Sequence, residues 1–177
     1  MRQLLDTIYR GSAYAAAFCL FAIFVLVSIQ VLARLADAAM RLAGLTPLGF
    51  IVPSIAEICG YLLAAASFMA LSYTLTVGGH IRVGLLVDRL PPSPRRAVET
   101  AVGIVGAGIA GYATLAMARL AIKSWTFNDV SYGFVPVPLW LPQALMALGL
   151  LLLVVALLDT TLSIARRGGV QPGRSEV

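Results

Sequence analysis

Apolar residues in this chain gather in four long runs, which short polar or proline-containing segments separate. The runs cover residues 11–33, 54–77, 97–118 and 139–164. About 20 apolar residues in a helix cross a hydrocarbon core of about 30 Å, so each run is long enough to span a membrane. The pattern predicts an all-α integral membrane protein, with one membrane domain over residues 1–177 and a flexible tail at 166–177.

The segment between the second and third runs has its own pattern. It begins at the Gly78-Gly79 pair and stops at Pro91 and Pro92, which break a helix on either side. Between these breaks the apolar and basic residues fall on different helical faces, which predicts a short amphipathic helix. It can lie in a membrane surface or pack on protein, and both interpretations are open. The polar residues of this interfacial hinge are His80, Arg82, Asp88 and Arg89.

Composition agrees with a membrane location. The 177 residues are 60% hydrophobic and 12% charged, and the mean hydropathy is +0.92, which excludes an ordinary soluble domain. The net charge of +5 does not indicate a nucleic-acid partner, because the arginines are spread over the predicted helix ends. Membrane lipid is the simpler partner for them.

The basic residues also predict the orientation. With four spans, the N-terminus, the hinge and the C-terminus share one side and carry nine Lys and Arg residues, against four on the other side. The excess places both termini in the cytoplasm. The first run is too long for the apolar core of a secretory signal, so we expect it to be a retained helix.

Glu57 lies about one turn inside the second span, where an unpaired carboxylate is costly. Arg34 ends the first span at a similar predicted depth, so a structural ion pair between Arg34 and Glu57 is the leading interpretation. A contact with another helix or a partner subunit, and an ion-translocating role for the carboxylate, are the alternatives.

The third span contains a stripe of small residues at four-residue spacing, formed by Gly103, Ala107 and Gly111. Small residues let another helix approach closely. The stripe predicts a packing face for a partner or for the chain itself.

Several kinds of chemistry have no residues to support them. No phosphate-binding glycine loop of the Walker type is present, and a single histidine with two scattered cysteines makes no metal or haem motif. No nucleophile has a histidine at a suitable depth, so we expect neither an enzyme nor a cofactor. The spans also carry too few polar side chains to line a substrate path through this chain alone.

Three features together resemble a known family. They are the hinge GGHIRVGLLVDRLPP, the acidic Glu57 near the start of the second span, and the segment VSYGFVPVPLWLPQALMALG. In this order they resemble the DctQ-like small permease subunit of tripartite ATP-independent periplasmic (TRAP) transporters, over nearly the whole chain. Members of that family often have two adjacent acidic residues in the second helix, whereas Ile58 follows Glu57 here.

The resemblance implies a multi-pass subunit of a bacterial inner membrane. A periplasmic solute-binding protein would capture a small organic acid, and a large multi-span permease subunit would move it inward by sodium symport. The small subunit would extend the scaffold of the large one. A membrane anchor of a respiratory or other enzyme complex is the alternative, with His80 as an isolated ligand, and the neighbouring genes would distinguish the two.

Overall fold

The computed structural model describes residues 2–77 and 91–167. Within these ranges the chain is all-α, with helices α1 (Arg2–Leu42), α2 (Ile55–Thr76), α4 (Pro92–Thr126) and α5 (Trp140–Arg167). Each is long and apolar enough to cross a membrane. The predicted amphipathic hinge, with His80, Arg82, Asp88 and Arg89, lies outside the described residues.

Helices α1, α4 and α5 are longer than the apolar runs, whereas α2 nearly coincides with its run. α1 has 41 residues and continues past the apolar run because residues 33–43 are rich in alanine and leucine, which favour helix even between charged residues. It ends at Leu42, two residues before Gly44, which adopts a left-handed backbone with φ of 75°, and the Leu45 amide donates to the Met40 carbonyl at 2.8 Å. α4 begins with a proline in its first turn, where a missing amide costs nothing.

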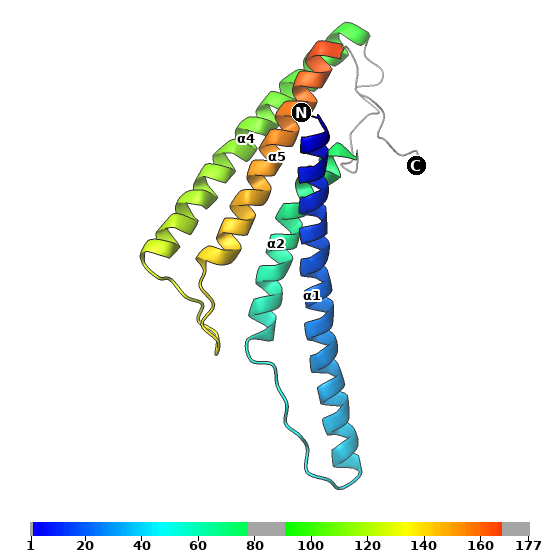
Figure 1. Ribbon diagram of the computed structural model, residues 1–177, viewed down its shortest axis with the longest axis vertical. Helices are drawn as coiled ribbons and strands as arrows, with labels where there is room; N and C mark the ends of the chain where they lie inside the picture. Colours follow the sequence, from blue (N-terminus) through cyan, green and yellow to red (C-terminus); the bar gives the residue numbers. More distant parts are fainter. Residues whose placement is uncertain (1, 78–90, 168–177) are drawn as a thin grey trace.

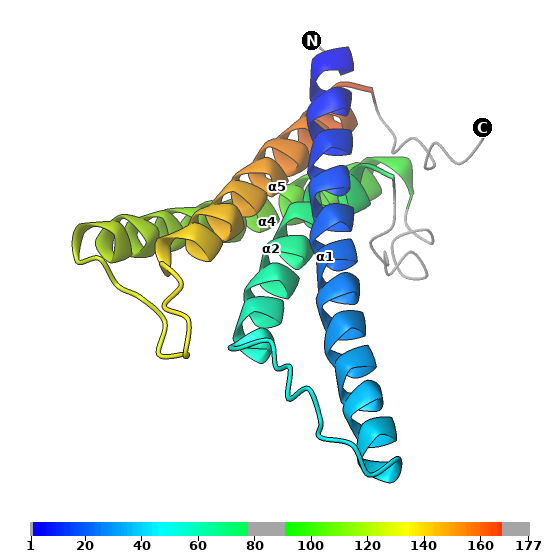
Figure 2. The same cartoon turned by 60° about the horizontal axis from the view of Figure 1, so that its bottom comes forward.

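The helices form an open row in the order α1, α2, α5, α4. α2 packs against α1 on one side and α5 on the other, and α4 packs mainly on α5. The views in Figures 1 and 2 show α4 and α5 as one pair that diverges from the pair formed by α1 and α2. The α1–α2 loop (residues 43–54) and the α4–α5 loop (residues 127–139) lie at one end of this row, and the N-terminus lies at the other (Figure 1).

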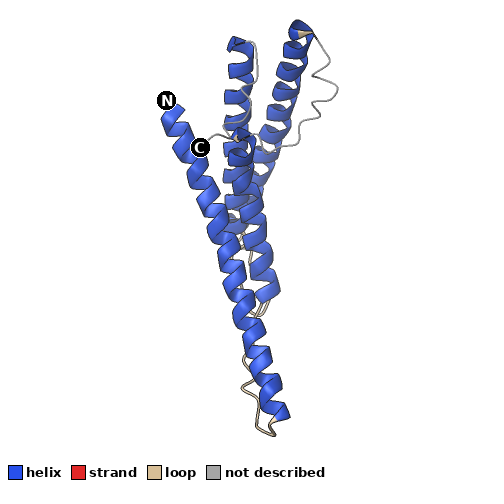
Figure 3. Cartoon of the chain, turned by 90° about the vertical axis from the view of Figure 1, so that its right-hand side faces the viewer, coloured by secondary structure: helices blue, strands red, loops and turns tan. Residues whose placement is uncertain are grey.

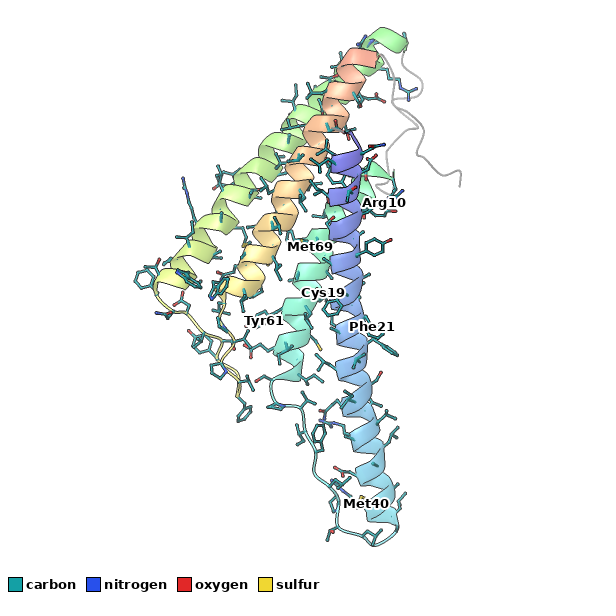
Figure 4. The ribbon with its side chains drawn as sticks, viewed as in Figure 1. Arg10, Cys19, Phe21, Met40, Tyr61 and Met69 are labelled. Atoms are coloured by element: carbon teal, nitrogen blue, oxygen red, sulfur yellow. The ribbon has the colours of Figure 1, made fainter. Side chains whose placement is uncertain are left out.

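Small side chains hold the row together. Ala16, Ala66 and Met69 form the buried cluster between α1 and α2, where Figure 4 shows Cys19 and Met69 on facing sides. The Ser12 and Ser72 hydroxyls are hydrogen-bonded to each other at 3.0 Å in the same contact. Such polar contacts and small residues are typical of helices that pack inside a membrane.

Large apolar side chains cover the outside of the row. On α1 the aromatic residues Tyr14, Phe18, Phe21 and Phe24 are exposed, and Phe21 points away from α2 (Figure 4). On α4, Val102, Val105, Ile109 and Tyr112 are exposed in the same way. These surfaces require lipid or another protein around them.

Candidate functional site

The α4–α5 loop is folded onto the first turn of α2. Val130 and Pro138 pair as an antiparallel bridge, and the buried Ser131 hydroxyl accepts a bond from the Val137 amide at 3.1 Å inside the loop. These bonds give the loop a fixed shape without a regular element. Figure 4 shows Tyr61 on the side of α2 that faces this loop.

Ser54 joins the loop to the start of α2. It has a left-handed backbone, with φ of 55°, and makes no side-chain cap to the helix. Its hydroxyl instead accepts a hydrogen bond from the Val135 amide at 3.1 Å. A residue directly before α2 is therefore used to hold a segment that lies 81 positions further along the chain.

Glu57 is the charged residue of this site. Its Oε1 accepts a hydrogen bond from the Tyr61 hydroxyl at 3.0 Å, while Oε2 is buried and has no hydrogen-bond partner. Gly133 lies directly over the carboxylate. A Cβ at that position would clash with Glu57 Oε2 and would come within 2.6 Å of the Ser54 hydroxyl oxygen. The loop can approach this closely only because Gly133 has no side chain.

The expected ion pair between Arg34 and Glu57 is not formed in this structure. Arg34 is exposed on α1, and Tyr61 is the hydrogen-bond partner of the Glu57 carboxylate. In the register set by the contact between Ser12 and Ser72, Glu57 is level with a position near Val27, and Arg34 lies about 10 Å further along α1 at a rise of 1.5 Å per residue.

The small-residue stripe of α4 divides into two parts. Gly103 lies against the Thr161 side chain of α5, which would clash with a Cβ, and Ala107 is buried. At Gly111 an added Cβ would meet nothing within 4 Å. The first two positions are therefore used within the chain, and Gly111 is open.

A close helix contact at Gly149 was not predicted from the sequence. An added Cβ there would lie 2.5 Å from the Phe68 carbonyl carbon and oxygen and 2.9 Å from the Met69 nitrogen, all backbone atoms of α2. The available signal was a single glycine inside the long apolar run of α5. It marks a point of close approach between α5 and α2.

The described residues bring no metal-binding group together. Within residues 2–77 and 91–167, no cluster of three or more His, Cys, Asp or Glu side chains could hold an ion. Cys19 and Cys59 are both free thiols. The chemistry available at the loop site is thus that of one carboxylate, the three hydroxyls of Ser54, Tyr61 and Ser131, and the backbone around them.

Comparison with known proteins identifies the family. The family model described as "Tripartite ATP-independent periplasmic transporters, DctQ component" matches residues 48–167, which is about two thirds of the chain. No curated protein and no solved structure matches the chain. The match covers α2, α4, α5 and both segments of the loop site, and the resemblance inferred from the hinge, Glu57 and the segment around Trp140 is confirmed. The chain belongs to the DctQ family of TRAP transporter components.

Proposed function

We propose that this chain is the small membrane subunit of a TRAP transporter and acts as scaffold and stabilising partner of a large permease subunit. The observation that carries the proposal is the open row of helices, in which α2 and α5 are central and α4 packs mainly on α5. A single row encloses no path for a substrate. It does provide a wall of apolar side chains against which a larger membrane protein can pack.

The substrate path then belongs to the large subunit. In this proposal a periplasmic solute-binding protein delivers a small organic acid, and sodium symport through the large subunit moves it inward. The small subunit has no enzymatic role. The excess of basic residues at the termini and the hinge supports an inner-membrane orientation with both termini in the cytoplasm.

The α4–α5 loop would then face the periplasm. Its Tyr132 and Phe134 side chains are almost fully exposed, although Gly133 between them packs on Glu57 and the Val135 amide donates to the Ser54 hydroxyl. Aromatic side chains on a fixed backbone bind partners at a low cost in conformational entropy. We therefore assign this loop as the part of the subunit nearest to the binding protein.

Reconstitution tests the proposal directly. Liposomes that contain only this chain should accumulate no organic acid under a sodium gradient, even with the binding protein present. Liposomes with the large subunit as well should accumulate it, and omission of this chain should abolish uptake. Accumulation by this chain alone, or full uptake without it, would show that the scaffold assignment is wrong.

A further inference from the structure

The end of α1 protrudes beyond its neighbour. In the register set by Ser12 and Ser72, the start of α2 at Ile55 is level with a position near Ile29. α1 continues to Leu42, so residues 30–42 extend about 20 Å further at 1.5 Å per residue. Figures 1 and 3 show this extension with the α1–α2 loop running back along it. We call residues 30–54 the protruding unit.

Two buried side chains hold the loop of the protruding unit against the helix. The Gly49 amide donates to both Asp37 carboxylate oxygens at 3.2 Å, and the Val52 amide donates to Gln30 Oε1 at 2.8 Å. Asp37 is 9% exposed and Gln30 is 8% exposed. The loop therefore satisfies these backbone donors with protein atoms, and the one acidic side chain of the unit is used internally.

The outer surface of the protruding unit is apolar. Leu42 is 91% exposed, and the other large exposed side chains are Leu32, Leu35, Leu45, Leu48, Phe50 and Ile51. On α1 this surface continues the exposed aromatic residues of the span, such as Phe21 and Phe24, and the small, partly exposed Ser28 is the polar residue between them and Leu35 on that face. A helix that passed from lipid into water would change from an apolar to a polar exterior.

Arg34 and Arg41 are the only charged side chains that the protruding unit exposes. They lie seven residues apart and so share one face of α1, while Leu35 and Leu42 share another. Arginines beside leucines suit the boundary between acyl chains and phosphates, because the guanidinium reaches the headgroups and the leucines stay in the apolar layer.

We propose that the protruding unit lies in the membrane interface and binds phospholipid, with Arg34 and Arg41 at the phosphates. Backbone donors that are satisfied internally fit a place where water is scarce. The residues from Gly11 to Leu42 extend about 48 Å, whereas about 35–38 Å separates the inner edge of the hydrocarbon core from the far edge of the opposite headgroup layer. A helix tilt of about 40°, at the upper end of the usual range, keeps the unit at this boundary. The proposal does not depend on the role of the chain in transport.

A spin label locates the unit. The full chain with Cys19→Ala and Cys59→Ala would carry Leu48→Cys, or Leu42→Cys as a second site, in vesicles of phosphatidylethanolamine and phosphatidylglycerol. A label at Phe21→Cys is the reference inside the span. We expect collisions with oxygen to exceed those with a water-soluble nickel complex at Leu48 and Leu42, by less than at Phe21. More frequent nickel collisions at both sites would overturn the proposal.

The same vesicles test the role of the two arginines. They also test the alternative that the large subunit, and not lipid, covers the protruding unit. Arg34→Gln with Arg41→Gln should shift the Leu48 label toward the nickel complex when phosphatidylglycerol is present, whereas Arg119→Gln on α4 should leave it unchanged. If Arg119→Gln shifts the accessibility of the Leu48 label by the same amount, Arg34 and Arg41 do not have the assigned role at the phosphates. If the label is open to nickel in the isolated chain and shielded from both reagents only after the large subunit is added, the unit is a protein contact and the lipid proposal is wrong.

Discussion

At the scale of single residues, the contact between Gly133 and Glu57 determines where the α4–α5 loop lies. Replacement of Gly133 by alanine would place a Cβ against the Glu57 carboxylate and the Ser54 hydroxyl. Glu57 cannot move away freely because Tyr61 holds its other oxygen. We expect Gly133→Ala to destabilise the docked loop by about 1–3 kcal/mol, as overpacking usually does.

Limited proteolysis of the loop measures this effect in the purified protein. Gly133→Ala should speed cleavage between α4 and α5, and the added change Glu57→Ala should restore part of the resistance by removing one clash, while the Ser54 hydroxyl still lies 2.6 Å from the new Cβ. Gly108→Ala is the matched control, because a Cβ at Gly108 meets nothing within 4 Å. Unchanged cleavage in Gly133→Ala would mean that the loop does not rest on Glu57.

Arg34 and Glu57 provide a second residue-scale prediction. Since the carboxylate is bonded to Tyr61 and Arg34 lies further along α1, the two residues should act independently. We expect the stability losses of Arg34→Gln and Glu57→Gln to add in the double variant within about 0.5 kcal/mol, measured by thermal unfolding in detergent. If the double variant loses clearly less stability than the sum of the two single losses, the two residues do form an ion pair.

The sequence identified Glu57 as unusual but could not identify its neighbours. A carboxylate inside an apolar run is visible from hydropathy alone, whereas its contact with Gly133 depends on how a loop 76 positions away folds back on α2. The register of Arg34 relative to Glu57 was not predictable for a related reason. Hydropathy predicted that the first helix ends near residue 33, and α1 instead continues to Leu42.

At the scale of helices, α2 is central because it contacts both α1 and α5. Gly149 makes the second contact possible, since any side chain there would meet the backbone of Phe68 and Met69. Backbone atoms cannot rotate away as a flexible side chain can. We therefore expect Gly149→Ala to separate α5 from α2 and to cost more than Gly133→Ala, above about 3 kcal/mol.

Thermal unfolding in detergent measures the Gly149 effect. Gly149→Ala should lower Tm strongly, and Gly60→Ala on the open face of α2 should leave it nearly unchanged, because a Cβ at Gly60 meets nothing within 4 Å. Equal Tm values for the two variants would show that the close approach of α5 to α2 is not what stabilises the row.

Helix number and type were predictable from the chain, and helix ends were not. An apolar run of about 20 residues has the length that a helix needs to cross the hydrocarbon core. All four predicted runs correspond to described helices. Hydropathy gives little signal for the part of a helix that extends beyond the hydrocarbon core, so the ends of α1 and α4 were missed. The pairing of helices was also not predictable, since Gly149 looked like any glycine in an apolar run.

At the scale of the whole molecule, a row of four helices leaves much of its apolar surface for a partner. Anything that binds only the folded chain stabilises it, so a large permease subunit should raise its Tm. The described side of α4 that borders its contact with α5 offers room for such a partner. Gly108 and Gly111 lie three residues apart there, and neither would meet a neighbour through an added Cβ.

The last prediction uses these two open glycines. Gly108→Leu with Gly111→Leu should leave the Tm of the isolated chain nearly unchanged, because a Cβ at either position meets no atom of this chain within 4 Å. The same variant should lose co-purification with the large subunit and the rise in Tm that the partner provides, since leucines would hold its helix away. Ile109→Leu on the same helix keeps the side-chain volume and should retain both. Co-purification of the double leucine variant at the wild-type level would exclude this face of α4 as the contact and direct the search to the aromatic face of α1.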